Sequence, residues 1–214
     1  MKKLIPFLLA SLFACWSCNL DDTYTQTNVR EMVNVEGAKL LNDYGYELTV
    51  VEDQVGAANW QIDGARYLAL YDILNRNLDI RLKEVIRSYK QDATLLGDGI
   101  ELPQGPVELF AQGISGPYYN VGFNFYRAKN SNYAHPIHFY YKIVNDHLYI
   151  YIAHADNGEN PVQMSEDDLV TESRMFSIPT DNFTNVYRIS LVLYSIFTNA
   201  DGTKRIEQET LEVN

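Results

Sequence analysis

Hydrophobic and polar residues alternate with a period of two along most of the chain after its first twenty residues. This period is typical of β-strands with one buried face, because successive side chains of an extended chain point to opposite sides. A helical period is hard to find there, and the 16 Tyr and 9 Phe residues favour strands. The pattern predicts an all-β protein with these strands: Arg30–Val35, Tyr46–Glu52, Ala65–Leu74, Asn77–Tyr89, Tyr118–Arg127, Ile137–Val144, His147–His154, Arg174–Ile178, Val186–Thr198 and Lys204–Val213.

Residues 91–116 interrupt this alternation with three turn-rich stretches, LLGDG, LPQGP and GISGP. Clusters of glycine and proline are typical of linkers between domains. We therefore expect an N-terminal domain over residues 29–92 and a C-terminal domain over residues 105–214. Both have sizes that are usual for small β-barrels and β-sandwiches.

The stretch KIVNDHLYI predicts one hairpin in detail, with Asn145-Asp146 as a two-residue turn. Asn and Asp tolerate the positive φ that such a turn requires. The turn pairs Val144 with His147 and sets the register of both strands. The core side then receives an apolar set: Phe139, Tyr141, Ile143, Leu148, Ile150 and Ile152. The opposite side receives a polar and aromatic set, our candidate binding face: His138, Tyr140, Lys142, Tyr149 and Tyr151, with Tyr126 as a candidate extension.

Exposed tyrosine rings stack on sugar faces or on the aromatic side chains of another protein, and their hydroxyls form hydrogen bonds at the rim. The alternative is that these tyrosines fill an interface between sheets or domains, because Tyr is a common half-buried strand residue. The sequence leaves both interpretations open.

The N-terminal residues have the anatomy of an export signal, in which KK precedes the apolar run LIPFLLASLFA. That run is too short to cross a membrane as a helix. Bacterial lipoprotein signals end in a small residue before a lipidated cysteine, and both Cys15 and Cys18 fit this position. We favour Cys18, which follows Ser17 and makes residues 1–17 the signal peptide and residues 18–28 an acidic, polar tether. An ordinary signal peptide with a coincidental cysteine is the alternative.

Charge limits the partners of the protein. The chain has 17 basic and 28 acidic residues, a net charge of −11, and removal of residues 1–17 with their two lysines changes it to −13. Such a surface repels nucleic acid and anionic lipid headgroups, so the expected membrane contact is the lipid on Cys18 itself. Cleavage before Cys18 would remove Cys15, and the lipid would occupy Cys18. The mature chain would then have no pair of cysteines, so its core must be stable without an internal disulfide.

Four histidines, His135, His138, His147 and His154, lie within twenty residues of one another. Strand parity places His135 and His138 on opposite faces, the hairpin separates His138 from His147, and His154 is expected on the other side. We therefore expect isolated histidines with satisfied hydrogen bonds, and neither a metal site nor a cofactor. The stretch ADNGEN lacks the EF-hand spacing and is expected to be a solvated turn, with a non-EF-hand calcium site as the alternative.

No catalytic motif is recognisable. Ser115 lies between glycines but lacks the G-x-S-x-G spacing, and no phosphate-binding loop is present in the sequence. Acidic residues are plentiful, but no spacing selects a catalytic pair.

The run DGARYLALYDILNRNLDIRLKEV, followed by GPYYNVGFNF, HPIHFYY and LYIYIAHADNGENP, resembles the NigD-like lipoproteins of Bacteroides-group bacteria. The shared features are an arginine-bearing strand after a D-G turn, here Arg66, an N-φ-x-φ strand from Asn120, and an H-x-(D/N)-x-G-(D/E) turn from His154. The resemblance implies an OB-like N-terminal β-barrel followed by a C-terminal β-sandwich. It supplies no catalytic residues, and Ala155 stands where relatives often have Asn.

Two functions follow from these observations. The first is a non-catalytic cell-envelope lipoprotein that binds a protein or glycan in bacteriocin immunity or in a surface complex. It is expected to be lipid-anchored to the outer membrane, either displayed on the cell surface or facing the periplasm. The alternative is a secreted hydrolase with an unrecognised acidic site.

Overall fold

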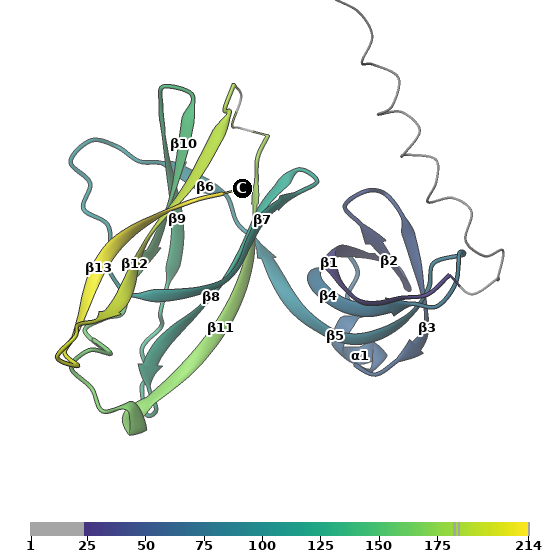
Figure 1. Ribbon diagram of the computed structural model, residues 1–214, viewed down its shortest axis with the longest axis horizontal. Coiled ribbons are helices and arrows are strands. Elements are labelled where there is room, and N and C mark those ends of the chain that lie inside the picture. The colour runs from purple at the N-terminus through teal and green to yellow at the C-terminus, as the bar shows by residue number, and fades with distance from the viewer. Residues whose placement is uncertain (1–23, 182, 184, 214) are drawn as a thin grey trace, which may run out of the picture.

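The computed structural model describes residues 24–181, 183 and 185–213. The expected signal peptide, Cys18 and most of the expected tether lie outside these residues. Within them, the helical elements are α1 (Ala57–Trp60) and the 3-10 turn η1 (Glu166–Asp168), and neither is long and apolar enough to cross a membrane. The remaining regular structure is β-strand, so the all-β prediction is confirmed. Figure 1 shows two lobes, a barrel and a sandwich.

The first five strands close into a barrel: β1 (Gln26–Glu36), β2 (Lys39–Asn42), β3 (Glu47–Asp53), β4 (Arg66–Ile73) and β5 (Asp79–Lys90). Antiparallel pairing joins β1 to β2 and β4, β2 to β3, and β4 to β5, while β3 and β5 pair in parallel. The ring order is therefore β1-β2-β3-β5-β4. Its interior is an apolar cluster that includes Val33, Leu40, Trp60, Tyr71 and Leu82.

The second lobe is a sandwich of two layers. One layer contains β7 (Val107–Ser115), β8 (Tyr118–Ala128) and β11 (Leu169–Pro179). The other has the order β13-β12-β10-β9-β6, with β6 (Ala93–Leu95), β9 (Ile137–Val144), β10 (His147–His154), β12 (Arg188–Thr198) and β13 (Lys204–Glu212). Side chains from both layers, Phe123, Phe139, Ile150 and Leu191 among them, form a separate apolar cluster.

Strand β5 connects the lobes. Its last residues, Ser88 to Lys90, pair in parallel with Met175 to Ser177 of β11. The strands of the barrel and the first layer of the sandwich thus form one hydrogen-bonded sheet of eight strands, and Figure 1 shows β5 running from one lobe to the other.

A buried charged network lies at this joint. The guanidinium of Arg66 donates two hydrogen bonds to the carboxylate of Asp43, both at 2.5 Å, and its side chain is 0 % exposed. It also donates to Ser177 Oγ at 2.9 Å and to Asn120 Oδ1 at 3.3 Å, and the Tyr118 ring lies against it at 4.4 Å. Residues of both lobes therefore share one set of hydrogen bonds.

The observed strands differ from the predicted ones in several places. The four-residue β2 was not predicted, β11 begins at Leu169 rather than Arg174, and β1 begins at Gln26, inside the expected tether. Residues 91–116, where we expected no strand, contain β6 and β7. The alternation of β7 is hidden because its pairing with β8 shifts register between Leu109 and Ala111.

Candidate functional site

The predicted hairpin is confirmed in register. Val144 pairs with His147, Tyr141 with Ile150 and Phe139 with Ile152. Asn145 and Asp146 have φ values of 49° and 63°, as a two-residue primed turn requires. The core side is buried at Phe139, Leu148, Ile150 and Ile152, whereas Ile143 near the turn is 41 % exposed.

The opposite side of the hairpin brings the five predicted residues together. Tyr140 lies directly opposite Tyr151, and Lys142 lies opposite Tyr149. His138 and Lys142 are exposed, the three tyrosines are half-buried, and none of the five belongs to either apolar cluster. We name these residues the tyrosine face: His138, Tyr140, Lys142, Tyr149 and Tyr151. That this face binds a partner stays a prediction.

Neighbouring strands support the tyrosine face from both sides. Thr94 of β6 pairs with Tyr140, and Val192 of β12 pairs with Tyr151. The Tyr149 ring stacks on His147 with ring centroids 4.2 Å apart, and His147 Nε2 is 2.8 Å from Ser190 Oγ. The proposed extension by Tyr126 was wrong, because Tyr126 belongs to β8 in the other layer and its hydroxyl donates to Glu108.

The expectation of isolated histidines was wrong for two of the four. His135 Nδ1 lies 3.1 Å from His154 Nε2, and His135 Nε2 lies 3.1 Å from the Glu159 carboxylate. Parity along strands could not reveal this contact, because His135 lies in the loop before β9 and that loop returns over the end of β10. A buried chain of hydrogen bonds therefore links Glu159, His135 and His154.

His154 ends this chain with an unpaired nitrogen. The His135 ring bridges its two neighbours, with Nε2 at the Glu159 carboxylate and Nδ1 at His154 Nε2. Among the residues that the structure describes, His154 Nδ1 has no hydrogen-bond partner, although the residue is only 1 % exposed. Burial, followed by the nearby His135, lowers the pKa of His154 from 6.5 to about 4.

The loop ADNGEN, residues 155–160, holds Glu159 in place at one end of this chain of hydrogen bonds. Asp156 accepts a hydrogen bond from the backbone N–H of Gly158, and Glu159 accepts one from the N–H of Ala128 at 2.8 Å. The His135 contact therefore fixes Glu159 inside a defined turn, where a solvated turn was expected. Across residues 24–181, 183 and 185–213, no three His, Cys, Asp or Glu side chains are grouped so as to hold a metal ion.

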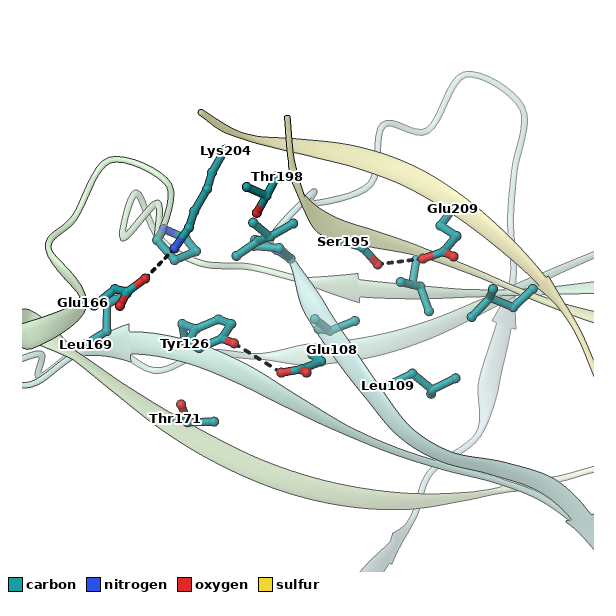
Figure 2. Close-up of a pocket in the computed structure, with 16 residues that line it drawn as sticks. Glu108, Leu109, Tyr126, Glu166, Leu169, Thr171, Ser195, Thr198, Lys204 and Glu209 are labelled. Atoms are coloured by element: carbon teal, nitrogen blue, oxygen red, sulfur yellow. Dashed lines mark hydrogen bonds and ion pairs between the residues drawn. The ribbon is translucent and has the colours of Figure 1, made fainter. Parts of the chain in front are cut away.

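A cavity of about 730 Å³ is a feature that the sequence did not predict. Strands β7, β8 and β11 of one layer and β12 and β13 of the other contribute to its lining, and Figure 2 shows these residues around it. The apolar part of the lining includes Val107, Leu109, Leu169, Leu193 and Leu211. We name this space the inter-layer cavity. Its residues are scattered over about half the chain, so no local pattern indicates it.

Three pairs of polar side chains line the inter-layer cavity. The Tyr126 hydroxyl donates to Glu108 at 3.2 Å, and Ser195 Oγ donates to Glu209 at 3.0 Å. The Lys204 ammonium lies 2.6 Å from Glu166 of η1. This lysine holds the pKa of Glu166 below its ordinary value, and burial together with Glu108 raises the pKa of the Tyr126 phenol.

Three solved structures with a similar fold come from Bacteroides species. A protein of unknown function from Bacteroides vulgatus is 19 % identical over 86 % of this chain and 90 % of its own, with a TM-score of 0.59. A NigD-like immunity protein from Bacteroides caccae is 16 % identical over 83 % and 90 %, with a TM-score of 0.54. A protein described as a "putative lipoprotein" from Bacteroides fragilis is 11 % identical over 88 % and 99 %, with a TM-score of 0.53.

No family model matches the chain, and no curated protein matches it. At these identities the likeness establishes the fold, a β-barrel followed by a β-sandwich. It agrees with the resemblance to NigD-like lipoproteins.

Proposed function

We propose that this protein is a non-catalytic lipoprotein of the bacterial outer membrane that binds a protein or a glycan through the tyrosine face. One observation carries the proposal: Tyr140, Tyr149 and Tyr151 lie side by side on the outer surface of the hairpin, outside both apolar clusters. Tyrosine in such a place offers a flat apolar ring and a hydroxyl to a partner.

The spacing of the rings suits an extended partner. Tyr140 and Tyr151 are cross-strand neighbours, so their rings start about 5 Å apart, the distance between adjacent strands. Exposed His138 and Lys142 lie on the same face and supply donors at its rim. A sugar ring or a flat side chain could stack on the tyrosines while its polar groups bond to this rim.

Anchoring is the second part of the proposal. The expected lipid on Cys18 and the acidic tether after it would hold the binding lobe at the outer membrane and at the cell surface. The names of two similar structures, an immunity protein and a "putative lipoprotein", support an envelope protein with a protein partner. A bacteriocin or a subunit of a surface complex is such a partner.

The hydrolase alternative receives less support. A general acid needs a carboxyl whose pKa is raised, so that it holds a proton at neutral pH. Glu166 in the inter-layer cavity has the opposite shift, because Lys204 stabilises its charged form.

Affinity capture tests the proposed face. Immobilised wild-type protein should retain a defined protein or glycan from the envelope fraction of its own bacterium. The double variant Tyr140→Thr/Tyr151→Thr should lose that material, because Thr keeps the strand preference but removes both rings. Tyr44→Thr, which changes a 74 % exposed tyrosine of the barrel, should retain it. Equal capture by all three proteins would refute the proposal.

A further inference from the structure

The inter-layer cavity has the size and composition of a small-molecule site. Its volume of about 730 Å³ lies within the roughly 300–1,000 Å³ that such sites occupy. Its walls come from the buried side chains Val107 and Leu193, which are 3 % and 1 % exposed, and from half-buried leucines. A ligand with an apolar part can therefore displace water from these walls.

The charged groups that line the cavity determine which electric charge a ligand should carry. Three carboxylates, Glu108, Glu166 and Glu209, face one ammonium, that of Lys204. Lys204 forms an ion pair with Glu166, whereas no cationic side chain of the described residues lies within ion-pair distance of Glu108 or Glu209. These two carboxylates therefore keep their negative charge uncompensated.

Hydroxyl groups fix the two free carboxylates in place. Tyr126 donates to Oε2 of Glu108, and Ser195 donates to Oε2 of Glu209, and Figure 2 shows both pairs beside the cavity. No hydrogen bond within the described residues occupies the other oxygen of either carboxylate. An ionised carboxylate only accepts hydrogen bonds, so these oxygens suit a cationic donor.

We propose that the inter-layer cavity binds an amphipathic organic cation, with its apolar part against Leu109, Leu193 and Leu211 and its ammonium or guanidinium group within reach of Glu108 or Glu209. This site is separate from the tyrosine face, which lies on the outer surface of β9 and β10. It adds a small-molecule ligand to a protein that we propose to bind a larger partner elsewhere.

Three fluorescent probes test the proposal, because they share a dansyl ring and a five-carbon stem but differ in charge. Dansylcadaverine carries one positive charge, its N-acetyl derivative is neutral, and dansyl-6-aminohexanoate is negative. Titrated into the full-length protein at low salt, the cation should bind at least fivefold more tightly than the neutral probe, and the anion most weakly. The advantage of the cation should shrink in 0.5 M NaCl, since salt screens the carboxylates.

Variants locate the site. Glu108→Gln/Glu209→Gln should bring the affinity for the cation down to that for the neutral probe, and the neutral probe should bind as before, which shows that the cavity is intact. Glu101→Gln/Glu212→Gln removes the same charge from exposed positions outside the cavity and should keep the fivefold difference. Tyr140→Thr/Tyr151→Thr should also keep it, which separates this site from the proposed tyrosine face.

Two results would overturn the inference. The first is equal binding of the three probes to the wild-type protein. The second is a preference for the cation that survives in Glu108→Gln/Glu209→Gln, because the charge would then act from elsewhere on the acidic surface.

Discussion

Arg66 makes the most extensive set of side-chain contacts at the joint of the two lobes. Its five N–H groups meet acceptors on Asn34, Asp43, Asn120 and Ser177, and both Arg66 and Asp43 are buried. Burying two charges costs free energy, and this cost is offset only where the partners and the remaining donors are satisfied. Arg66, at the start of β4 just after the D-G turn, therefore has a structural role.

Replacing Arg66 by Met should strongly destabilise the protein, because the carboxylate of Asp43 would stay buried without its cationic partner. We expect the free energy of unfolding in urea to fall by about 3–5 kcal/mol. Lys39→Met is a matched control, since it breaks an ion pair with Glu47 whose side chains are 57 % and 53 % exposed, and it should change stability by less than about 1 kcal/mol. Similar losses for the two variants would contradict the role of Arg66.

His154 makes stability depend on pH. Its pKa is about 4 in the folded protein and about 6.5 in the unfolded chain, so the unfolded state binds the proton first as the pH falls. Folding should therefore lose up to about 3 kcal/mol between pH 6.5 and pH 4, in addition to losses from acidic groups.

Urea denaturation at pH 7.5 and pH 5 measures this dependence. His154→Gln removes the titrating ring, so its loss of stability between the two pH values should be clearly smaller than that of the wild type. His138→Gln changes an exposed histidine and should behave as the wild type. An unchanged pH dependence in His154→Gln would show that the buried ring does not control it.

At the scale of elements, the β9–β10 hairpin shows how burial varies along one face. Phe139 and Ile143 point to the same side of β9, but Phe139 is 1 % exposed and Ile143 is 41 % exposed. The core of the sandwich lies under the first residue and ends before the second.

Alanine substitutions should report this difference. Phe139→Ala should cost about 3–5 kcal/mol because it leaves a cavity in the sandwich core, whereas Ile143→Ala should cost less than about 1 kcal/mol. Thermal unfolding of the two variants beside the wild type measures both. A large loss at Ile143 would mean that the core extends to the turn.

The same hairpin shows what a sequence can predict. Regular alternation on both sides of Asn145-Asp146 defined both strands and their pairing, because a two-residue turn permits one register. Strand β2 was too short to show a period, and the register shift near Leu109 concealed β7. The OB-like character of the barrel stays a prediction, supported by its ring order and by α1 between β3 and β4.

The sequence predicts a site well only when its residues lie on neighbouring segments of the chain. The tyrosine face could be predicted because one hairpin contains all of it. The His135–His154 pair depends on how a loop folds back, and Glu108 and Glu209 of the inter-layer cavity come from β7 and β13, the edge strands of two different layers. No spacing along the chain encodes such contacts.

At the scale of the whole molecule, the charge falls from −11 to −13 once residues 1–17 with their two lysines are removed. With the expected lipid, the mature protein would be held at a membrane that its own surface repels. The barrel, joined to the sandwich through β5 and Arg66, would then separate the tether from the tyrosine face. The lipid is the only membrane contact that the sequence predicts.

Metabolic labelling with a radioactive fatty acid tests that contact. Label should enter the wild type and Cys15→Ala but not Cys18→Ala, because only Cys18 is expected to become the new N-terminus. Labelling of Cys18→Ala together with loss from Cys15→Ala would move the mature terminus to Cys15. An absence of label from all three proteins would favour an ordinary signal peptide.

The proposed function requires the tyrosine face to be an open surface rather than part of the packed core. The free energy of unfolding of Tyr140→Thr and Tyr151→Thr, measured beside Phe139→Ala, tests it most directly. An open face leaves no cavity when a ring is removed, so each tyrosine variant should lose about 1 kcal/mol or less against about 3–5 kcal/mol for Phe139→Ala. Losses at the tyrosines as large as that at Phe139 would show that they are packing residues and would contradict the account.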